Sequence, residues 1–228
     1  SLGEKVLGYL LYYEKSKDFY IELPDDIDEW DAPMLLSSFV KKDVRTVNAY
    51  WSKVWVQQRI IPVDRQNLGS ILRENDLTYY DEFTLLLLSE GRCAQDDCYI
   101  VPISEDALPP AVIARLQARI EEIVPLEDRH MLVFFRDGSA RRCDMKKVCD
   151  APQFSGILIH RNLFFSVRVQ TDGYGITWGE NLDVASDLLY QSGELLPVSL
   201  SDFQSYAASC ITDTAGACQM LSCSRQNI

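Results

Sequence analysis

The sequence predicts an α+β protein: a helical domain with an N-terminal β-hairpin, then a small α+β domain with two hairpins, then the start of a helix-turn-helix. The Asp137-Gly138 pair lies between two apolar runs, which is typical of a tight hairpin turn. Of the 228 residues, 47% are hydrophobic and 25% are charged, as in an ordinary globular protein with room for one or two domains. Residues 46–58 place apolar side chains at helical spacing: Val47, Tyr50, Trp51, Val54 and Trp55.

The first domain is expected to span residues 1–126. Residues 6–13 and 19–23 are rich in β-branched and aromatic side chains, and the polar residues between them predict a hairpin connection. The segments after the hairpin alternate between helical periodicity and loop composition. Helices are expected over residues 32–42, 46–58, 65–75, 80–89 and 109–123, and a strand is expected over residues 99–103.

Residues with helix-boundary chemistry set the limits of these elements. Asp64 is an expected N-cap, because its carboxylate can accept a hydrogen bond from the first turn of a helix. Pro109 and Pro110 suit the first turn of the last helix, since the missing N–H is not needed there. Pro125 is expected to end that helix, and the charged segment 126–130 marks the domain boundary.

The second domain is expected over residues 127–198, where the pattern changes to short alternating runs. Two hairpins are predicted, and Asp183 is expected to cap a short helix that ends near Tyr190. A third segment, residues 199–228, begins with a helix for which Ser201 is the expected cap. The expected strands are 131–136 with 139–143 and 164–170 with 175–178, and the expected helix of the third segment covers 201–209.

The formal charge of −12 makes the chain as given a poor nucleic-acid binder, because such binding draws its affinity from Lys and Arg contacts to phosphates. Any DNA contact must come from a local patch or from residues beyond Ile228. One basic cluster is a candidate phosphate-binding or acidic-partner patch. The alternative is a solvated sheet edge whose charges discourage strand addition. The cluster consists of Arg136, Arg141, Arg142, Lys146 and Lys147.

The sequence carries no motif for catalysis, so we expect no enzyme, no catalytic residue, no cofactor and no metal. Asp96-Asp97, with Asp81 and Glu82 upstream, is the best carboxylate cluster, but a solvated acidic loop or a helix cap explains it more simply. The seven cysteines occur without a secretory signal, which favours reduced thiols and a cytoplasmic location. No run of about 18 apolar residues exists, so no contact with a membrane is expected.

A family resemblance covers about residues 127–195. Its motifs are the runs 133–144, 165–169 and 176–183 and the Leu189-Tyr190 pair, with Trp178 and Leu182-Asp183 as the most specific part. This pattern resembles the bacterial domain of unknown function 2442. The resemblance implies a small α+β fold, often beside a DNA-binding helix-turn-helix and sometimes near toxin–antitoxin genes. It implies no known catalysis.

Residues 214–228 resemble the first half of an excisionase- or MerR-like helix-turn-helix, with small and apolar residues at the packed positions of the first helix. The second helix of such a motif reads the bases, and here the sequence ends in its first turn. We therefore expect a longer protein whose reading helix continues beyond Ile228. The residues expected to begin DNA reading are Ser224, Arg225, Gln226 and Asn227.

A further resemblance covers about residues 55–103. Gln58-Arg59, Pro62 and the run 80–83 are similar to the leader segment of some clostridial proteins that carry a HipA-like kinase. The kinase is absent from this sequence, so its activity does not carry over.

Together these patterns predict a transcriptional or mobile-element regulator that binds DNA through the segment from Thr214, with most of the reading helix missing from the sequence. The alternative is a protein-binding module, such as an antitoxin-like partner of a neighbouring toxin. Either a protein partner or a homodimer would fit that second class. Basic residues after Ile228 would favour DNA binding, whereas an immediate end would favour the protein-binding alternative.

Overall fold

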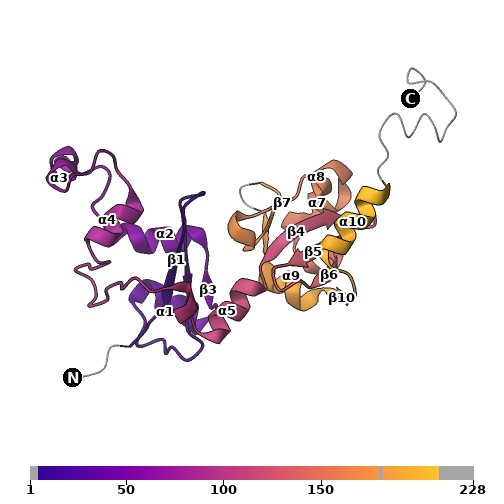
Figure 1. Ribbon diagram of the computed structural model, residues 1–228, viewed down its shortest axis with the longest axis horizontal. Helices are drawn as coiled ribbons and strands as arrows, with labels where there is room; N and C mark the ends of the chain where they lie inside the picture. Colours follow the sequence, from indigo (N-terminus) through magenta and orange to yellow (C-terminus); the bar gives the residue numbers. More distant parts are fainter. Residues whose placement is uncertain (1–4, 180–181, 211–228) are drawn as a thin grey trace, which may run out of the picture. The chain divides into compact units, whose positions relative to one another are not determined.

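The computed structural model describes residues 5–179 and 182–210, and these form a mixed α+β structure (Figure 1). The chain divides into two units, Ser1–Ala114 and Arg115–Ile228. This division falls before the boundary expected at residue 126, because residues 120–125 are a strand of the second unit rather than the end of a helix. The expected helix-turn-helix start, residues 214–228, lies outside the described residues.

The sheet of the first unit has three antiparallel strands in the order β1-β2-β3. The predicted hairpin is confirmed, since β1 and β2 pair with Leu11 opposite Tyr20 and Tyr13 opposite Asp18. The short β3 lies in the region expected to begin a helix. The strands are β1 (Tyr9–Tyr13), β2 (Asp18–Glu22) and β3 (Thr46–Val47).

Helices of the first unit form where apolar periodicity and capping residues coincide. The Asn48 side chain accepts a hydrogen bond from the Trp51 backbone N–H (3.1 Å), and the Asp81 side chain accepts one from that of Thr84 (2.9 Å). Figure 1 shows α2 crossing the sheet, where Trp55 and Val56 are buried. The helices are α1 (Met34–Lys41), α2 (Ala49–Gln57), α3 (Leu68–Glu74), α4 (Glu82–Leu88) and α5 (Pro110–Gln117), with a 3₁₀ turn η1 (Glu105–Ala107).

Three expectations for the first unit are wrong. Asp64 caps no helix, because α3 begins only after Asn67. Residues 99–103 form no strand, since this segment finds no neighbouring strand among the described residues. The last helix ends at Gln117 instead of Ile123, because Ile120 and the residues after it pair with a strand of the second unit.

The main sheet of the second unit has four antiparallel strands in the order β10-β6-β5-β4. Its centre is the predicted hairpin around Asp137-Gly138, in which Gly138 has the left-handed φ of 83° that the turn requires. The edge strand β10 comes from much later in the chain and pairs with β6. The strands are β4 (Ile120–Pro125), β5 (His130–Phe135), β6 (Ala140–Asp144) and β10 (Glu194–Leu196).

A smaller sheet, in the order β7-β8-β9, completes the second unit together with short helices. The expected strand 164–170 is mostly wrong, because its first residues belong to helix α8 and only Arg168 and Val169 pair. Asp183 does not cap the following helix but begins β9. The elements are α6 (Met145–Val148), η2 (Pro152–Phe154), α7 (Ser155–Ile159), α8 (Arg161–Phe165), β7 (Arg168–Val169), η3 (Thr171–Gly173), β8 (Gly175–Thr177), β9 (Asp183–Ala185) and α9 (Ser186–Ser192).

Alternation along β5 gives the four-stranded sheet two different faces. Met131, Val133 and Phe135 belong to the core of the unit. On the opposite face, the ring of Phe134 packs against that of Phe203 in α10 (Leu200–Cys210), with centroids 5.3 Å apart. The helix predicted over residues 201–209 is confirmed as α10.

The cap of α10 is Ser199 rather than the expected Ser201. The Ser199 hydroxyl accepts from the Asp202 backbone N–H (3.1 Å) and donates to the Asp202 carboxylate (2.7 Å). This reciprocal pair satisfies backbone and side-chain groups of the first turn together.

Within the described residues, no helix combines the length and the apolar character needed to cross a membrane.

Candidate binding cleft

An open cleft of about 210 Å³ lies on the second unit, at the face of the four-stranded sheet that is opposite the core. The strand register creates it, because His130 lies opposite Asp144 on β6, and Arg142 lies opposite Glu194 on β10. These side chains occupy alternate strand positions and therefore share one face. The lining residues are His130, Arg142, Asp144, Lys147, Val148, Ser192 and Glu194.

One carboxylate holds two of these side chains in place. Asp128 accepts a hydrogen bond from the Arg142 guanidinium and another from the His130 backbone N–H (3.1 Å). The His130 imidazole Nδ1 lies 3.2 Å from the same carboxylate. Desolvation opposes ionisation of Asp128, but the His130 hydrogen bond and the nearby charge of Arg142 outweigh it and lower its pKa. Asp128 is therefore ionised at neutral pH and pairs with Arg142 beside the cleft.

The two carboxylates that line the cleft differ in their surroundings. Asp144 accepts a hydrogen bond from the Lys146 backbone N–H (3.1 Å), which caps α6, and it lies 3.7 Å from the Lys147 ammonium. Glu194 is exposed on β10 and has no ion-pair partner among the described residues. The lining residues carry two carboxylates, Asp144 and Glu194, and two fixed cations, Arg142 and Lys147. Because Arg142 is bonded to Asp128, which does not line the cleft, Glu194 is left without an ion pair in the described part of the chain.

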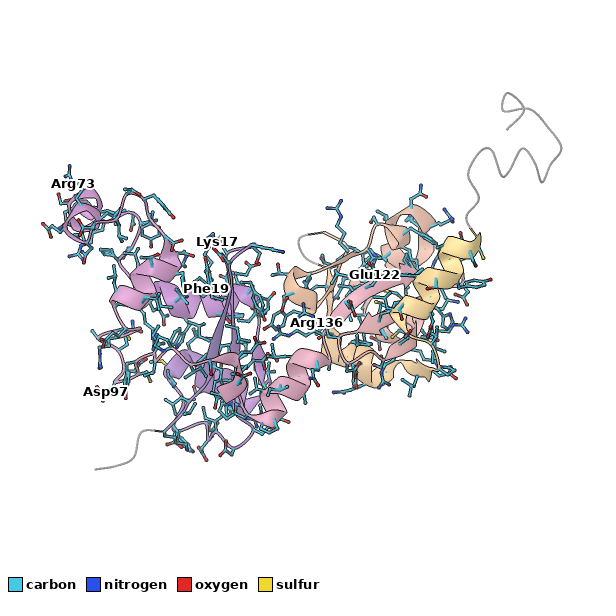
Figure 2. The ribbon with its side chains drawn as sticks, in the orientation of Figure 1. Lys17, Phe19, Arg73, Asp97, Glu122 and Arg136 are labelled. Carbon is cyan, nitrogen blue, oxygen red and sulfur yellow. The ribbon has the colours of Figure 1, made fainter. Side chains whose placement is uncertain are left out.

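The basic cluster that the sequence singled out is divided between several places. Arg142 and Lys147 line the cleft, whereas Arg136, labelled in Figure 2, donates to the Asp172 carboxylate (2.5 and 3.0 Å). The Arg141 guanidinium lies 4.1 Å from the centroid of the Tyr190 ring. Lys146 is exposed on α6. Each of the four arginine and lysine side chains other than Lys146 thus has an acidic or aromatic neighbour.

Three of the four carboxylates in the acidic cluster that the sequence singled out make structural contacts. Asp81 caps α4, and Glu82 accepts from the Gln57 amide (3.0 Å). Asp96 accepts from the buried Arg59 guanidinium and from the Cys98 backbone N–H (3.0 Å), whereas Asp97, labelled in Figure 2, is exposed.

The thiol beside Asp96 is poorly suited to nucleophilic chemistry. Burial, together with the charge of Asp96, raises the pKa of the Cys98 thiol to about 11. A thiol with such a pKa carries little of the reactive thiolate at neutral pH. Within residues 5–179 and 182–210, no group of three or more His, Cys, Asp and Glu side chains is arranged to hold a metal ion.

Sequence reasoning missed most of the cleft. His130 and Asp128 lie in a charged segment that reads as a linker, and only the paired strands show that they face Arg142. Glu194 could not be found locally, because the pairing of β10 with β6 joins segments far apart in the sequence. The expected DNA-reading residues, Ser224, Arg225, Gln226 and Asn227, lie outside the described residues.

Comparison with known protein families gives a match within the second unit. No curated protein and no solved structure matches the chain. Residues 120–207 match the model of a family described as a protein of unknown function, DUF2442. This match runs from β4 into α10, and it supports the resemblance seen in the sequence. Through residues 120–207, which include every residue of the cleft, the chain is similar to the DUF2442 family.

Proposed function

We propose that this chain is a protein-binding module whose cleft on the second unit holds a basic segment of a partner protein. The observation that carries the proposal is the uncompensated carboxylate of Glu194 in a cleft whose two cations are already matched by Asp128 and Asp144. A Lys or Arg side chain entering beside Glu194 would complete the charge balance. Complementary charge of this kind favours the correct partner and speeds association.

The electrostatics of the whole chain support a basic partner over a nucleic acid. A net charge of −12 attracts cationic surfaces and repels phosphates over about 10 Å at 0.1 M salt. The Arg142 guanidinium is already bonded to Asp128, so a phosphate would have to compete with that carboxylate for it.

A transcriptional or mobile-element regulator remains a second proposal for the whole protein. The Ser224-Arg225-Gln226-Asn227 sequence, which begins with a helix-capping residue, supports it. In that case the second unit would join the regulator to a partner protein while residues from Thr214 onwards contact DNA. A neighbouring toxin with an exposed basic segment would be a partner of the expected chemistry.

The test is binding of two dye-labelled peptides, one with a Lys-Ser-Gly repeat and one with a Glu-Ser-Gly repeat, followed by fluorescence anisotropy at 0.1 M salt. We expect the basic peptide to bind and the acidic peptide not to bind. Glu194→Gln should weaken binding of the basic peptide by roughly twofold to fivefold, as for one exposed charge pair.

The matched control is Glu121→Gln, which removes the same charge from an exposed position on β4, the opposite edge of the same sheet. It should leave binding almost unchanged. Equal weakening by both substitutions would mean that the peptide responds only to net charge, and preferential binding of the acidic peptide would overturn the proposal.

A further inference from the structure

The first unit has one open sheet edge of unusual composition. Strand β1 pairs with β2 on one side, and no described strand pairs with its other side. Its sequence, Tyr-Leu-Leu-Tyr-Tyr, has no charged residue and no proline. Backbone N–H and C=O groups that point away from the paired neighbour at such an edge form a template for another strand.

The other sheet edges among the described strands carry features that discourage strand addition. β4 has a bulge, two glutamates and a terminal proline, and β10 has only three residues and is followed by Pro197. β3 and β7 have two residues each, and β9 has three. The open edge of β1 therefore differs from the others in length and in chemistry.

Strand β1 is held firmly from its core side. Leu10 and Tyr12 pack against the core of the first unit, and the Tyr12 ring stacks on Phe83 with centroids 4.1 Å apart. Tyr9, Leu11 and Tyr13 alternate with them and lie on the other face. A strand fixed in this way presents its edge without the entropy cost of ordering it first.

We propose that β1 pairs antiparallel with β1 of a second copy of this chain, about a two-fold axis at Leu11. In this register Leu11 lies opposite Leu11 of the second copy, Tyr9 opposite Tyr13, and Leu10 opposite Tyr12. Every pair joins residues of the same face, so the three-stranded sheets of two copies become one six-stranded sheet. A two-fold axis requires a surface that is complementary to itself.

The composition of β1 is complementary to a second copy of the same strand. The register gives aromatic–aromatic pairs at Tyr9 and Tyr13 and an aliphatic pair at Leu11, and these are among the favoured cross-strand combinations. A slip by one residue would place Tyr9 opposite Tyr12, which face opposite sides of the sheet. Two-fold registers centred on Leu10 or Tyr12 keep the faces but pair fewer residues of β1, whereas the register at Leu11 pairs all five.

Cysteine cross-linking tests the register directly. Tyr9→Cys and Tyr13→Cys chains are prepared separately, and each is oxidised mildly alone and then as an equal mixture. Opposite residues of antiparallel strands have Cα atoms about 4.5–5.5 Å apart, within reach of a disulfide. We expect more cross-linked dimer from the mixture than from either chain alone. A Leu11→Cys chain should cross-link by itself, because Leu11 lies opposite Leu11 of the second copy. The unsubstituted chain controls for its own cysteines.

Analytical ultracentrifugation of the full chain tests the assembly itself. We expect a dimer for the unsubstituted chain and a monomer for Leu11→Lys, with an unchanged far-ultraviolet circular dichroism spectrum. Tyr79→Lys, at a position in the same unit that is 70% exposed, should remain dimeric.

Three results would overturn the proposal: a monomeric parent chain at tens of micromolar, a dimeric Leu11→Lys, or a mixture that cross-links no more than its components. Should Leu11→Lys fail to fold, the cross-linking of Tyr9→Cys with Tyr13→Cys decides alone.

Discussion

Gly173 lies so close to Ile120 that a Cβ atom on it would sit 2.0 Å from the Ile120 carbonyl oxygen. The φ angle of Gly173 is also left-handed, at 78°. This contact joins the turn η3 to β4 and leaves no room for any side chain.

The first prediction follows from that contact. Gly173→Ala should lower the free energy of unfolding by about 3 kcal/mol or more, since backbone strain and a steric clash with main chain add together. Gly138→Ala is the matched control, because Gly138 has a similar φ of 83° but no atom within 4 Å of the added Cβ. Gly138→Ala should lower the free energy of unfolding by only about 1–2 kcal/mol. Urea denaturation measures both, and equal losses would show that the clash relaxes.

The second prediction concerns how α10 is held. Phe203 is half-buried against Phe134, and no residue of α10 is fully buried. An isolated helix of this length is marginal in water, so this contact should decide its stability. Phe203→Ala should therefore speed amide hydrogen exchange in α10 while β5 and β6 stay protected. Tyr206→Ala, at a position 69% exposed on the same helix, should leave the exchange rates of α10, β5 and β6 unchanged. Unchanged exchange in Phe203→Ala would disprove this account.

The third prediction concerns acid stability. Burial opposes ionisation of Asp137, but hydrogen bonds from Ser139 and Tyr190 and the charge of Arg141 outweigh it, so its pKa lies below the ordinary value. A carboxyl whose native pKa is lowered stabilises the fold above its unfolded pKa of about 3.9, and this contribution is lost as the pH falls through the native value. Asp137→Asn should thus reduce the stability at pH 7 and flatten its decline below about pH 5.

The measurement is the free energy of unfolding of both chains from pH 7 to pH 3. Tyr190→Phe removes the 2.7 Å hydrogen bond to Asp137 and should flatten the decline partially. An unchanged slope in Asp137→Asn would mean that other carboxylates govern acid unfolding.

The fourth prediction concerns thiol reactivity. Burial raises the pKa of the Cys143 thiol to about 11 and that of Cys149 to about 12, while Cys210 is exposed on α10. Because the thiolate is the reactive form, iodoacetamide at pH 8 should modify Cys210 readily and leave Cys143 and Cys149 intact until the second unit unfolds. Peptide mapping by mass spectrometry distinguishes the sites. Early modification of Cys143 would contradict the buried position observed.

The sequence predicted the elements whose signals are local. The Asp137-Gly138 hairpin, the helix that becomes α2 and the N-terminal hairpin all follow from turn chemistry or short-range periodicity. The error at residues 109–123 has a definite cause. Val112, Leu116 and Ile120 share a helical spacing, but Ile120 opposes Phe135 in the sheet. Pairing with β5 buries Ile120, and this tertiary gain outweighs the local helical pattern.

The candidate cleft was predictable only in part. The basic residues Arg142 and Lys147 stand out in the sequence, but their acidic neighbours come from three separate segments. Asp128 precedes β5, Asp144 ends β6, and Glu194 begins β10. Their meeting depends on strand order, which a single sequence does not specify.

The late position of β10 has a consequence for synthesis on the ribosome. The first unit is complete at Ala114 and can fold while the rest is still being translated. The second unit differs, because β6 keeps an unpaired edge until Glu194–Leu196 emerge. Until then a nascent chain presents that edge, together with the ring of Phe134, to chaperones and to neighbouring chains. The interval between translation of β6 and of β10 is thus a period in which the nascent chain exposes a strand edge that the finished second unit covers.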